Sequence, residues 1–360
     1  MPSIAVIAGD GVGKEVIPVG LRVLEAVASL DVEMLPWGAE HYAATGVMMP
    51  GDALARLDSH DAIYLGAVGW PTVPDHVSLW GLLLPIRKAF QLYVNLRPVK
   101  LLPGVAGPLA GRGPDEIDMM FVRENTEGEY SGAGGRVHVG APYEVAVEAP
   151  VFTRIAVERI ARYSLDLARE RSGSLISVTK SNASRYAYVL WDQVVAEVAR
   201  EYPEVTVQRM HVDAMAARMV LRPETVDVVV ASNLFADILT DLGAALQGSL
   251  GLAASANLDP TRAHPSLFEP VHGSAPDIAG QGRANPIGAI WSGALMLRHL
   301  GLEDEAARVE DAIARVLADG AVRTGDLGGS AGTEEVADAV ISAMRAAASA
   351  PANDNMGGSR

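Results

Sequence analysis

Short runs rich in β-branched residues alternate with helical segments along most of the 360-residue chain, and this alternation constrains the fold more than any other feature. Strands that are separated by helices are typical of α/β proteins, so we predict that class. The expected strands are Ser3–Ala8, Asp61–Leu65, Tyr93–Val99, Ile117–Val122, Leu175–Thr179, Val205–Val212 and Val226–Ala231. The expected helices are Lys14–Ala28, Thr153–Arg171, Arg185–Glu201, Asn233–Gln247, Pro286–Leu300, Glu303–Ala318 and Thr333–Ala347.

Composition and charge exclude several classes of function. The formal net charge is −15, whereas a nucleic-acid partner would require a basic face. The absence of cysteine excludes disulfides, thiolate zinc sites and a cysteine nucleophile. No apolar stretch approaches the ~18 residues of a membrane span and there is no basic leader, so we expect a cytoplasmic protein without a membrane partner. An anionic ligand would need a local arginine cluster to overcome the overall negative charge.

The segment 125–150 does not fit the alternation. It is glycine-rich and contains the strand-like stretches "RVHVG" and "YEVAVEA". We predict a protruding hairpin. Because a lone two-stranded ribbon is marginal in water, we expect it to pack on another surface, such as a second subunit.

The stretch "SNLFADILTDLGAALQG", residues 232–248, predicts a helix whose only two charges are both negative. Asp237 and Asp241 are four residues apart, so they share a face, and a like-charge pair at this spacing costs about 0.2–0.5 kcal/mol. No lysine or arginine lies between Arg222 and Arg262. The remaining positions are apolar or small, which predicts a helix packed nearly all round. A bound Mg²⁺ or Mn²⁺ would explain the pair, and two solvent-facing aspartates are the alternative.

Two further residues are candidates for the same site. Asp213 ends one expected strand and opens the next helix, so it is either a third metal ligand or a simple helix N-cap. Lys180 closes the apolar run "SLISVT". Beside a metal ion the pKa of this lysine would fall, and a neutral lysine is a competent general base. A solvated surface lysine is the alternative.

Three arginines lie at the ends of expected elements: Arg87 in "LLLPIRK", Arg97 in "YVNLRP" and Arg123 in "MMFVREN". In an acidic protein they could clamp a small dicarboxylate by bidentate pairing. Local salt bridges to the glutamates that follow are the alternative for Arg123. Tyr130, just beyond, offers a phenol as a proton donor.

Two glycine-rich stretches complete the set of candidates. "GDGVGKE", residues 9–15, lacks the spacing of a phosphate loop and the third glycine of the dinucleotide fingerprint, so we predict a plain strand-to-helix turn. "EPVHGSAPDIAGQGRANP", residues 269–286, predicts a long loop that ends with Asn285 as N-cap and Pro286 at the first helical position. Long ordered loops are usually functional.

In that order, these motifs resemble the β-hydroxyacid oxidative decarboxylases, the family of isopropylmalate and isocitrate dehydrogenases. The resemblance runs from "GDGVGKE" through "NLRPVK", "VRENTEGEY", "TKSN", "VDAMA" and "SNLFADILTDLGAALQGSLG" to "FEPVHGSAPDIAGQGRANP" and "DLGGSAGT". It covers nearly the whole chain. So many ordered motifs make it specific.

The resemblance implies a fold and an assembly. The fold would be the family's own two-domain α/β architecture, with a central mixed sheet flanked by helices, and not a true Rossmann fold. Residues 1–93 plus 248–360 would form a cofactor-binding domain, and residues 94–247 a substrate and dimerisation domain with the arm 125–150. Lys180 and Asp213 would enter the site from the other subunit, which implies a homodimer with shared active sites.

The resemblance also implies a role for each candidate residue. It implies a substrate clamp of Arg87, Arg97 and Arg123, an acid in Tyr130, a base in Lys180, and metal ligands in Asp213, Asp237 and Asp241. It implies a cofactor pocket of His272, Gly273, Ser274, Ala275, Asp277, Ile278 and Asn285. Asp277 matches the residue that accepts from both ribose hydroxyls and would repel a 2′-phosphate, whereas NADP-using relatives place lysine and tyrosine at positions 277 and 278. We therefore expect NAD, with Mg²⁺ or Mn²⁺; a monovalent cation such as K⁺ is left open.

Substrate selectivity in this family lies in the segment before the first arginine, here "DHVSLWGLLLPIR". Trp80 stands where isopropylmalate enzymes carry a glutamate, and we expect it to fill the space of a large C3 substituent. Gly81 and Leu83 replace the serine and asparagine of isocitrate enzymes. With "SLWG", this favours the tartrate and D-malate dehydrogenase branch: NAD-dependent oxidative decarboxylation of D-malate to pyruvate and related oxidation of tartrate. A 3-isopropylmalate dehydrogenase and a catalytically silent regulatory subunit are the alternatives.

Overall fold

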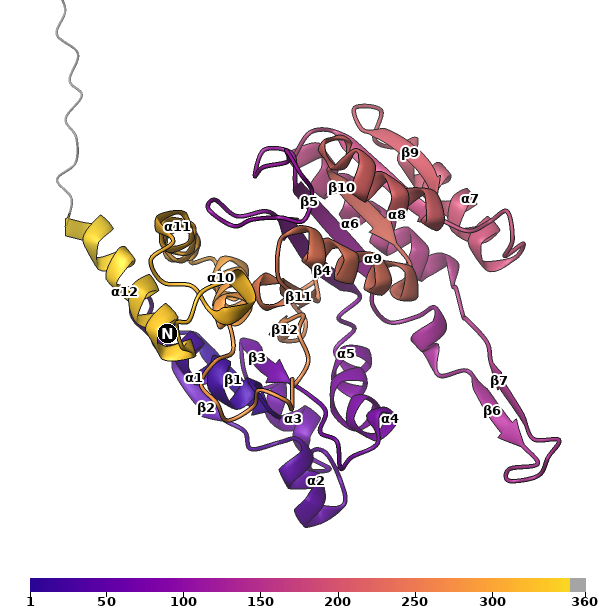
Figure 1. Ribbon diagram of the computed structural model, residues 1–360. Helices are drawn as coiled ribbons and strands as arrows, with labels where there is room; N and C mark the ends of the chain where they lie inside the picture. The colour runs from indigo at the N-terminus through magenta and orange to yellow at the C-terminus, as the bar shows by residue number, and fades with distance from the viewer. Residues whose placement is uncertain (350–360) are drawn as a thin grey trace, which may run out of the picture.

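The computed structural model describes residues 1–349, which build a ten-stranded sheet flanked by helices (Figure 1). The strand order is β2-β1-β3-β12-β11-β4-β5-β10-β8-β9. The strands of this sheet are β1 (Ser3–Gly9), β2 (Asp31–Met34), β3 (Ala62–Ala67), β4 (Val94–Lys100), β5 (Asp118–Glu124), β8 (Ser174–Thr179), β9 (Thr206–His211), β10 (Val228–Ala231), β11 (Ala254–Leu258) and β12 (Ser266–Pro270). The helices are α1 (Gly13–Glu25), α2 (Ala39–Thr45), α3 (Ala53–Leu57), α4 (Asp75–Ser78), α5 (Leu84–Ala89), α6 (Arg154–Glu170), α7 (Ala187–Ala199), α8 (Val212–Leu221), α9 (Asn233–Leu246), α10 (Ile287–His299), α11 (Glu303–Asp319) and α12 (Thr333–Ser349), and a π-helical turn, η1 (Leu79–Leu83), joins α4 to α5.

The sheet is mixed, which confirms the predicted fold class. The pairs β12–β11, β11–β4 and β4–β5 are antiparallel, and the other pairs of this sheet are parallel. One half of the strand order comes from residues 1–93 and 248–349, and the other half comes from residues 94–247. Because β11 pairs with β4, the two halves share one continuous sheet. Their division into two domains remains a prediction.

All of the strands and helices expected from the sequence are present, with ends shifted by at most three residues. The strands β2, β11 and β12 were not predicted. β11 reads "ASANL" and β12 reads "SLFEP", so neither has the β-branched composition of an independent strand. Their position in the middle of the sheet makes them strands. None of the described helices is long and apolar enough to cross a membrane.

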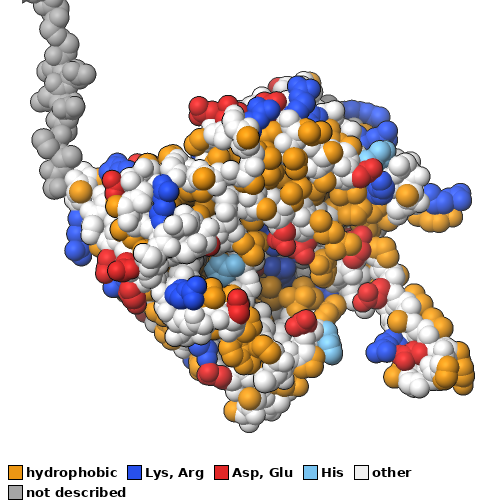
Figure 2. Space-filling model, in the orientation of Figure 1, with side chains coloured by type: hydrophobic (Ala, Val, Ile, Leu, Met, Phe, Trp, Pro, Cys, Tyr) orange, Lys and Arg blue, Asp and Glu red, His pale blue; other side chains and the backbone are white. Residues whose placement is uncertain are grey.

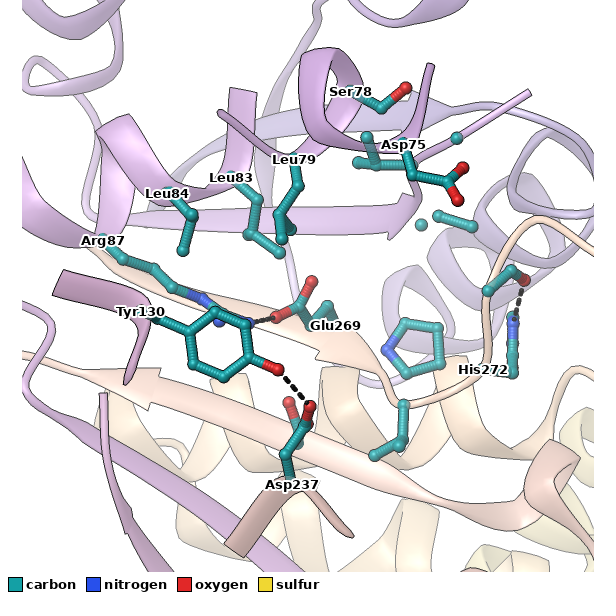
Figure 3. A pocket seen from close by; sticks show the side chains of 18 of the residues that line it. Asp75, Ser78, Leu79, Leu83, Leu84, Arg87, Tyr130, Asp237, Glu269 and His272 are labelled. Atoms are coloured by element: carbon teal, nitrogen blue, oxygen red, sulfur yellow. Dashed lines mark hydrogen bonds and ion pairs between the residues drawn. The ribbon is translucent and has the colours of Figure 1, made fainter. Parts of the chain in front are cut away.

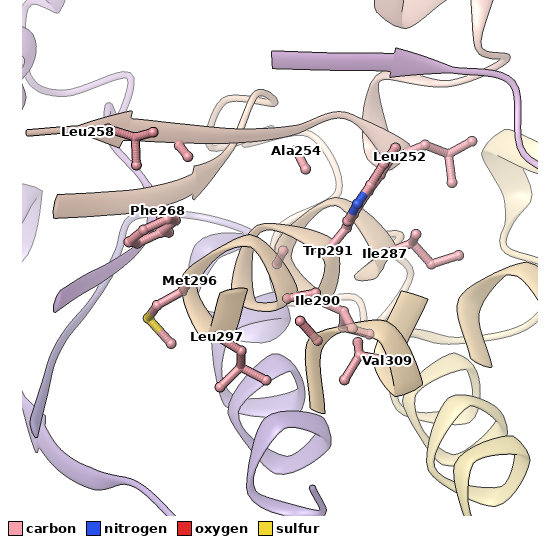
Figure 4. Packing of buried hydrophobic residues seen from close by; sticks show 14 of the residues in the cluster. Leu252, Ala254, Leu258, Phe268, Ile287, Ile290, Trp291, Met296, Leu297 and Val309 are labelled. Atoms are coloured by element: carbon pink, nitrogen blue, oxygen red, sulfur yellow. The ribbon is translucent and has the colours of Figure 1, made fainter. Parts of the chain in front are cut away.

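Helix α10 anchors the core of the first half of the sheet (Figure 4). Ile290 and Leu297 on α10 are completely buried, as are Phe268 on β12 and Val309 on α11. Each such side chain contributes about 1.5–3 kcal/mol when it leaves water. This packing fixes β12, and β12 carries one wall of the site described below.

The segment 125–150 forms the predicted hairpin. Strands β6 (Gly134–Val137) and β7 (Val145–Glu148) pair antiparallel, outside the main sheet, and protrude from the body of the molecule (Figure 1). The arm exposes apolar side chains: Val137 is 56% exposed and Val147 is 58% exposed. Such a surface is unusual for a ribbon that stays in water.

Candidate active site

A cavity of about 330 Å³ lies where the two halves of the sheet meet. Figure 2 shows basic and acidic side chains together in a hollow between the two halves of the molecule, and Figure 3 shows the cavity from close by. All three predicted clamp arginines line the cavity, together with Tyr130 and Asp237. Arg87 comes from α5, Arg97 from β4 and Arg123 from β5, and they are between 3% and 7% exposed. The structure therefore brings together the predicted substrate clamp, the predicted acid and one of the predicted metal ligands.

Each arginine is held in place by hydrogen bonds. Arg87 Nη2 donates to Glu269 Oε1 at 2.8 Å (Figure 3). Arg97 Nε donates to Asn95 Oδ1, and its Nη1 donates to Thr240 Oγ1, both at 2.7 Å. Burial lowers the pKa of Arg97 to about 9, and the neighbouring Arg123 adds to this effect. Buried guanidinium groups that are held this rigidly are suited to bind carboxylates, which would restore their lost solvation.

Arg123 does not form the local salt bridges that the sequence left open. Its Nε and Nη2 donate to Asn233 Oδ1 at 2.9 and 2.7 Å, and its Nη1 donates to Asp237 Oδ1. Glu124 turns away and accepts from the backbone and hydroxyl of Thr126 at 3.0 and 2.6 Å. The alternative of a local salt bridge is therefore wrong for Arg123.

Asp237 is the anionic centre of the cavity. Its Oδ2 accepts from the hydroxyl of Tyr130 at 3.0 Å (Figure 3). Its Oδ1 lies 3.5 Å from Arg97 Nη1. Burial acts to raise the pKa of Asp237, but Arg123 and Arg97 outweigh burial and the pKa is lowered. Burial and then the charge of Asp237 raise the pKa of Tyr130. The pair is thus a carboxylate with a protonated phenol bound to it.

Asp241 lies one turn further along α9 in a different environment. It is exposed, and burial followed by the charge of Asp237 raises its pKa. The predicted all-round packing of this helix is wrong: Ile238 is 59% exposed. The helix packs its small residues on the sheet, where a Cβ at Gly243 would lie 2.5 Å from the Val99 side chain, so the face with Ile238 points outward.

Lys180 and Asp213 form a separate pair. Lys180 Nζ donates to Asp213 Oδ1 at 2.7 Å, and this bond lowers the pKa of Asp213. Asp213 lies in the first turn of α8 after His211, so the alternative of a simple N-cap is wrong. Neither residue of the pair lines the cavity. Within residues 1–349, no three histidine or acidic side chains gather as a metal site, so the structure does not bring Asp213 to Asp237 and Asp241.

The loop after β12 contributes the expected cofactor residues. His272 and Gly273 line the cavity, and the Nε2 atom of His272 is buried without a hydrogen-bond partner. Burial lowers the pKa of His272. Asn285 Oδ1 accepts from the backbone N–H of Ile287 at 3.0 Å, but α10 begins at Ile287, so Pro286 and not Asn285 is the N-cap residue. The other predicted residues of this loop do not line the cavity; they are Ser274, Ala275, Asp277 and Ile278.

The turn between β1 and α1 holds this loop in place. It is a strand-to-helix turn, as predicted. Glu15 accepts from the backbone N–H groups of Gly280 and Gly282 at 2.5 and 2.8 Å, and Val12 N donates to Ser274 O at 2.9 Å. The carboxylate of Glu15 therefore ties the 280–282 segment to the start of α1.

The predicted selector Trp80 lies outside the cavity lining, whereas Leu79, Leu83 and Leu84 line it (Figure 3). Trp80 is 43% exposed and the Nζ of Lys88 lies 4.4 Å from its ring centroid. The apolar wall of the cavity is therefore made of leucines.

Sequence reasoning missed Glu269 and the buried amides behind it. Asn257 Nδ2 donates to Glu269 Oε1 at 2.8 Å, and Asn257 Oδ1 accepts from Asn95 Nδ2 at 3.1 Å. Because Glu269 binds Arg87 and Asn95 binds Arg97, this network connects two arginines of the clamp. A glutamate after the apolar stretch "SLF" is the one signal that could have found it.

The sequence and the fold match known proteins closely. The family model described as isocitrate/isopropylmalate dehydrogenase matches residues 3–340. The crystal structure of isocitrate dehydrogenase from Methylococcus capsulatus has a TM-score of 0.89 at 35% identity, and the match covers 96% of this chain and 100% of that chain. This chain therefore belongs to the isocitrate/isopropylmalate dehydrogenase family, as its motifs predicted.

Two relatives narrow the class of enzyme. The probable tartrate dehydrogenase/decarboxylase of Agrobacterium vitis is 53% identical over 348 residues, covering 95% of this chain and 97% of the relative. The D-malate dehydrogenase (decarboxylating) of Escherichia coli K12 is 53% identical over 350 residues, covering 94% and 97%. The chain is accordingly a decarboxylating dehydrogenase, and its relatives support the oxidative decarboxylation of a hydroxy acid.

Proposed function

We propose that the protein oxidises D-malate to pyruvate and CO₂ with NAD⁺ and a divalent metal ion, and that it oxidises tartrate by a related reaction. The observation that carries this proposal is the cavity itself. In a protein of net charge −15 it gathers three buried arginines, together with the carboxylates of Asp75, Asp237 and Glu269 and the phenol of Tyr130. This concentration of guanidinium groups suits a small dicarboxylate.

The arginines bind the substrate's carboxylates. Arg87 faces Arg97 and Arg123 from the other half of the sheet, so a diacid would connect the two halves. Asp237 occupies part of this positive surface through Arg123. Substrate carboxylates would bind the same guanidinium groups, and this binding would orient the C2 carbon.

The donor set fits a hard divalent cation such as Mg²⁺ or Mn²⁺. Asp237 and Asp241 offer carboxylate oxygens one turn apart, and the charge of Asp237 raises the pKa of Asp241, a repulsion that a cation would relieve. Asp213 of the partner subunit would be the third ligand. When bound, the ion would acidify the C2 hydroxyl and stabilise the negative charge that develops as CO₂ leaves.

Two residues move protons. Lys180 of the partner subunit would accept the proton of the C2 hydroxyl while hydride leaves C2 for the cofactor. Tyr130 would then donate its phenolic proton to C3 after decarboxylation. Its raised pKa supports this role, because the phenol stays protonated until a carbanion-like carbon forms beside it.

The loop from His272 to Asn285 fits NAD. The unpaired Nε2 of His272 needs a hydrogen-bond partner, which the cofactor would supply. Asp277 is exposed and free to accept from ribose hydroxyls, and its charge would repel the 2′-phosphate of NADP.

The proposal includes a homodimer with shared active sites. Ile238 on α9, Leu221 at the end of α8 and Val147 on the arm are 59%, 70% and 58% exposed. Apolar side chains this exposed support a subunit interface. Lys180 and Asp213, outside the cavity of their own chain, would serve the partner's cavity.

One observation favours a second candidate, 3-isopropylmalate dehydrogenase. Leu79, Leu83 and Leu84 form an apolar wall that could accept a branched C3 substituent. One measurement distinguishes the two candidate functions.

That measurement is a substrate panel with purified protein, Mn²⁺ and either NAD⁺ or NADP⁺. We expect NADH formation with D-malate, slower turnover of tartrate, and little activity with NADP⁺ or isocitrate. Rapid turnover of 3-isopropylmalate without turnover of D-malate would replace the first proposal by the second. Binding of NAD⁺ without turnover of any 2-hydroxy diacid would refute both.

A further inference from the structure

The π-helical turn η1 separates two sets of side chains. Leu79 and Leu83 line the cavity, while Trp80 between them does not. A π-turn adds a residue to the helical repeat, and such turns are frequent at functional sites. The tryptophan is thereby directed to a different neighbour.

That neighbour is the turn η2 (Glu129–Ser131), which carries Tyr130. Lys88 Nζ lies 4.4 Å from the centroid of the Trp80 ring and donates to the backbone oxygen of Ser131 at 2.9 Å. A cation held against an aromatic ring is attracted by the negative face of the ring. Lys88 therefore connects the tryptophan to the residue that follows Tyr130.

A second contact reaches the same turn directly. Gly132 follows η2 with φ +79°, and a Cβ at this position would lie 2.4 Å from Cη2 of Trp80. The ring thus packs against the backbone on one side of Tyr130. On the other side, the phenol is held by Asp237 at 3.0 Å.

We propose that Trp80 is a positioning residue for Tyr130, acting through Lys88 and the 129–132 turn, and that Leu79 and Leu83 decide which C3 substituents fit. This inference rests on the proposed function for the role of the phenol. It changes the expectation from the sequence, in which Trp80 itself filled the space at C3. A small displacement of an acid from the reacting carbon is costly, since about 1 Å can reduce a rate ~10²-fold.

The test compares Trp80→Ala, Lys88→Met and Trp80→Phe with the matched control Leu83→Ala from the same turn. Two quantities are measured: hydrogen exchange of the backbone in 129–133 without substrate or cofactor, and the ratio of kcat/KM for D-malate to that for 3-isopropylmalate. The first readout requires no activity. The second separates positioning from steric selection.

We expect faster exchange in 129–133 for Trp80→Ala and Lys88→Met, with kcat for D-malate reduced roughly tenfold and the substrate ratio changed by less than about threefold. Trp80→Phe should keep the exchange in 129–133 and the kcat for D-malate close to those of the wild type, because it keeps an aromatic ring next to Lys88. Leu83→Ala should leave the exchange unchanged and move the ratio at least about tenfold toward the larger substrate.

Unchanged exchange in both Trp80→Ala and Lys88→Met would overturn the proposal. A collapse of the substrate ratio in Trp80→Ala as large as that in Leu83→Ala would also overturn it, because Trp80 would then be the selector. Failure of the proposed function looks different: the wild type would not turn over D-malate, while the exchange result would still report on the turn.

Discussion

The two aspartates of α9 occupy the same helix face one turn apart, yet they belong to different regions of the molecule. Asp237 faces the buried cavity, where Arg123, Arg97 and Tyr130 neutralise and bind it. Asp241 lies outside, where burial and its neighbour's charge raise its pKa. The chain therefore neutralises the buried charge of Asp237 with its own side chains. The charge of Asp241 stays at the surface, where it is available to a partner from outside the chain.

The same contrast separates the clamp from the Lys180–Asp213 pair. The clamp arginines are between 3% and 7% exposed, whereas the side chains of Lys180 and Asp213 are 30% and 69% exposed. A surface ion pair of this kind contributes only about 0–1 kcal/mol, so stability is a weak reason for it. An active site completed by a second subunit and a cation, as proposed above, would give it a function.

Loss of the base should have the largest effect. Lys180→Met should reduce kcat by ~10²–10⁴-fold, because the proton of the C2 hydroxyl then has no acceptor. The fold should be unaffected, since Lys180 lies at the surface with one exposed partner. Steady-state NADH formation together with circular dichroism checks both parts. A near-normal kcat in Lys180→Met would show that Lys180 is not the base of the active site.

Weaker metal binding should follow from Asp241→Asn. The concentration of Mn²⁺ needed for half-maximal activity should rise at least about tenfold, as expected when a carboxylate that faces the metal loses its charge. Titration of the EDTA-treated enzyme measures it. Asp338→Asn, a substitution on the distant α12, provides a control that should not move the requirement. An unchanged requirement in Asp241→Asn would show that this exposed region binds no metal.

The smallest effect concerns the stability of the metal-free protein. Substitution of Asp237 and substitution of Asp241 should change this stability in opposite directions. Asp237→Asn should destabilise by about 1–3 kcal/mol, because it leaves buried guanidinium groups without their counter-charge. The lowered pKa of Asp237 gives stability above the ordinary carboxyl pKa that is lost as pH falls through the lowered value.

The raised pKa of Asp241 acts in the opposite direction. Its ionisation costs stability as pH rises through the raised value, so Asp241→Asn should stabilise the metal-free protein by about 0.2–0.5 kcal/mol at pH 7 and by nothing in acid. Urea denaturation in EDTA from pH 7 to well below the ordinary carboxyl pKa of 3.8 measures both variants. Equal destabilisation by the two substitutions would contradict the proposed difference between the environments of Asp237 and Asp241.

The sequence predicted the strands and helices whose apolar pattern is continuous, such as β1 and α6. It could not predict β11 and β12, because alanine, serine and asparagine become strand residues there only through their neighbours in the sheet. For the same reason Glu269 was missed. Its partner Arg87 is 182 residues away in the chain, and no local pattern records that contact.

The site was predictable where a residue's own motif identified it, as with the three arginines and Tyr130. The contacts and charges around each of these residues could not be predicted from the sequence. The sequence places no cation near Asp237, yet Arg97 and Arg123 reach it from two strands. The outward face of α9 was mistaken for a packed one because large side chains usually face the core, whereas close contact with β4 requires small ones such as Gly243.

The central claim is that the buried region of one subunit works with the exposed pair of another, and hybrid dimers test it most directly. Lys180→Met and Tyr130→Phe subunits, each inactive as homodimers, are co-expressed with two different tags and the hybrid is purified. If the sites are shared, one site of the hybrid carries both substitutions and the other carries neither, so about half of the wild-type kcat per dimer should return. A hybrid as inactive as its parents would place Lys180 and Tyr130 in the same chain's site and contradict the account.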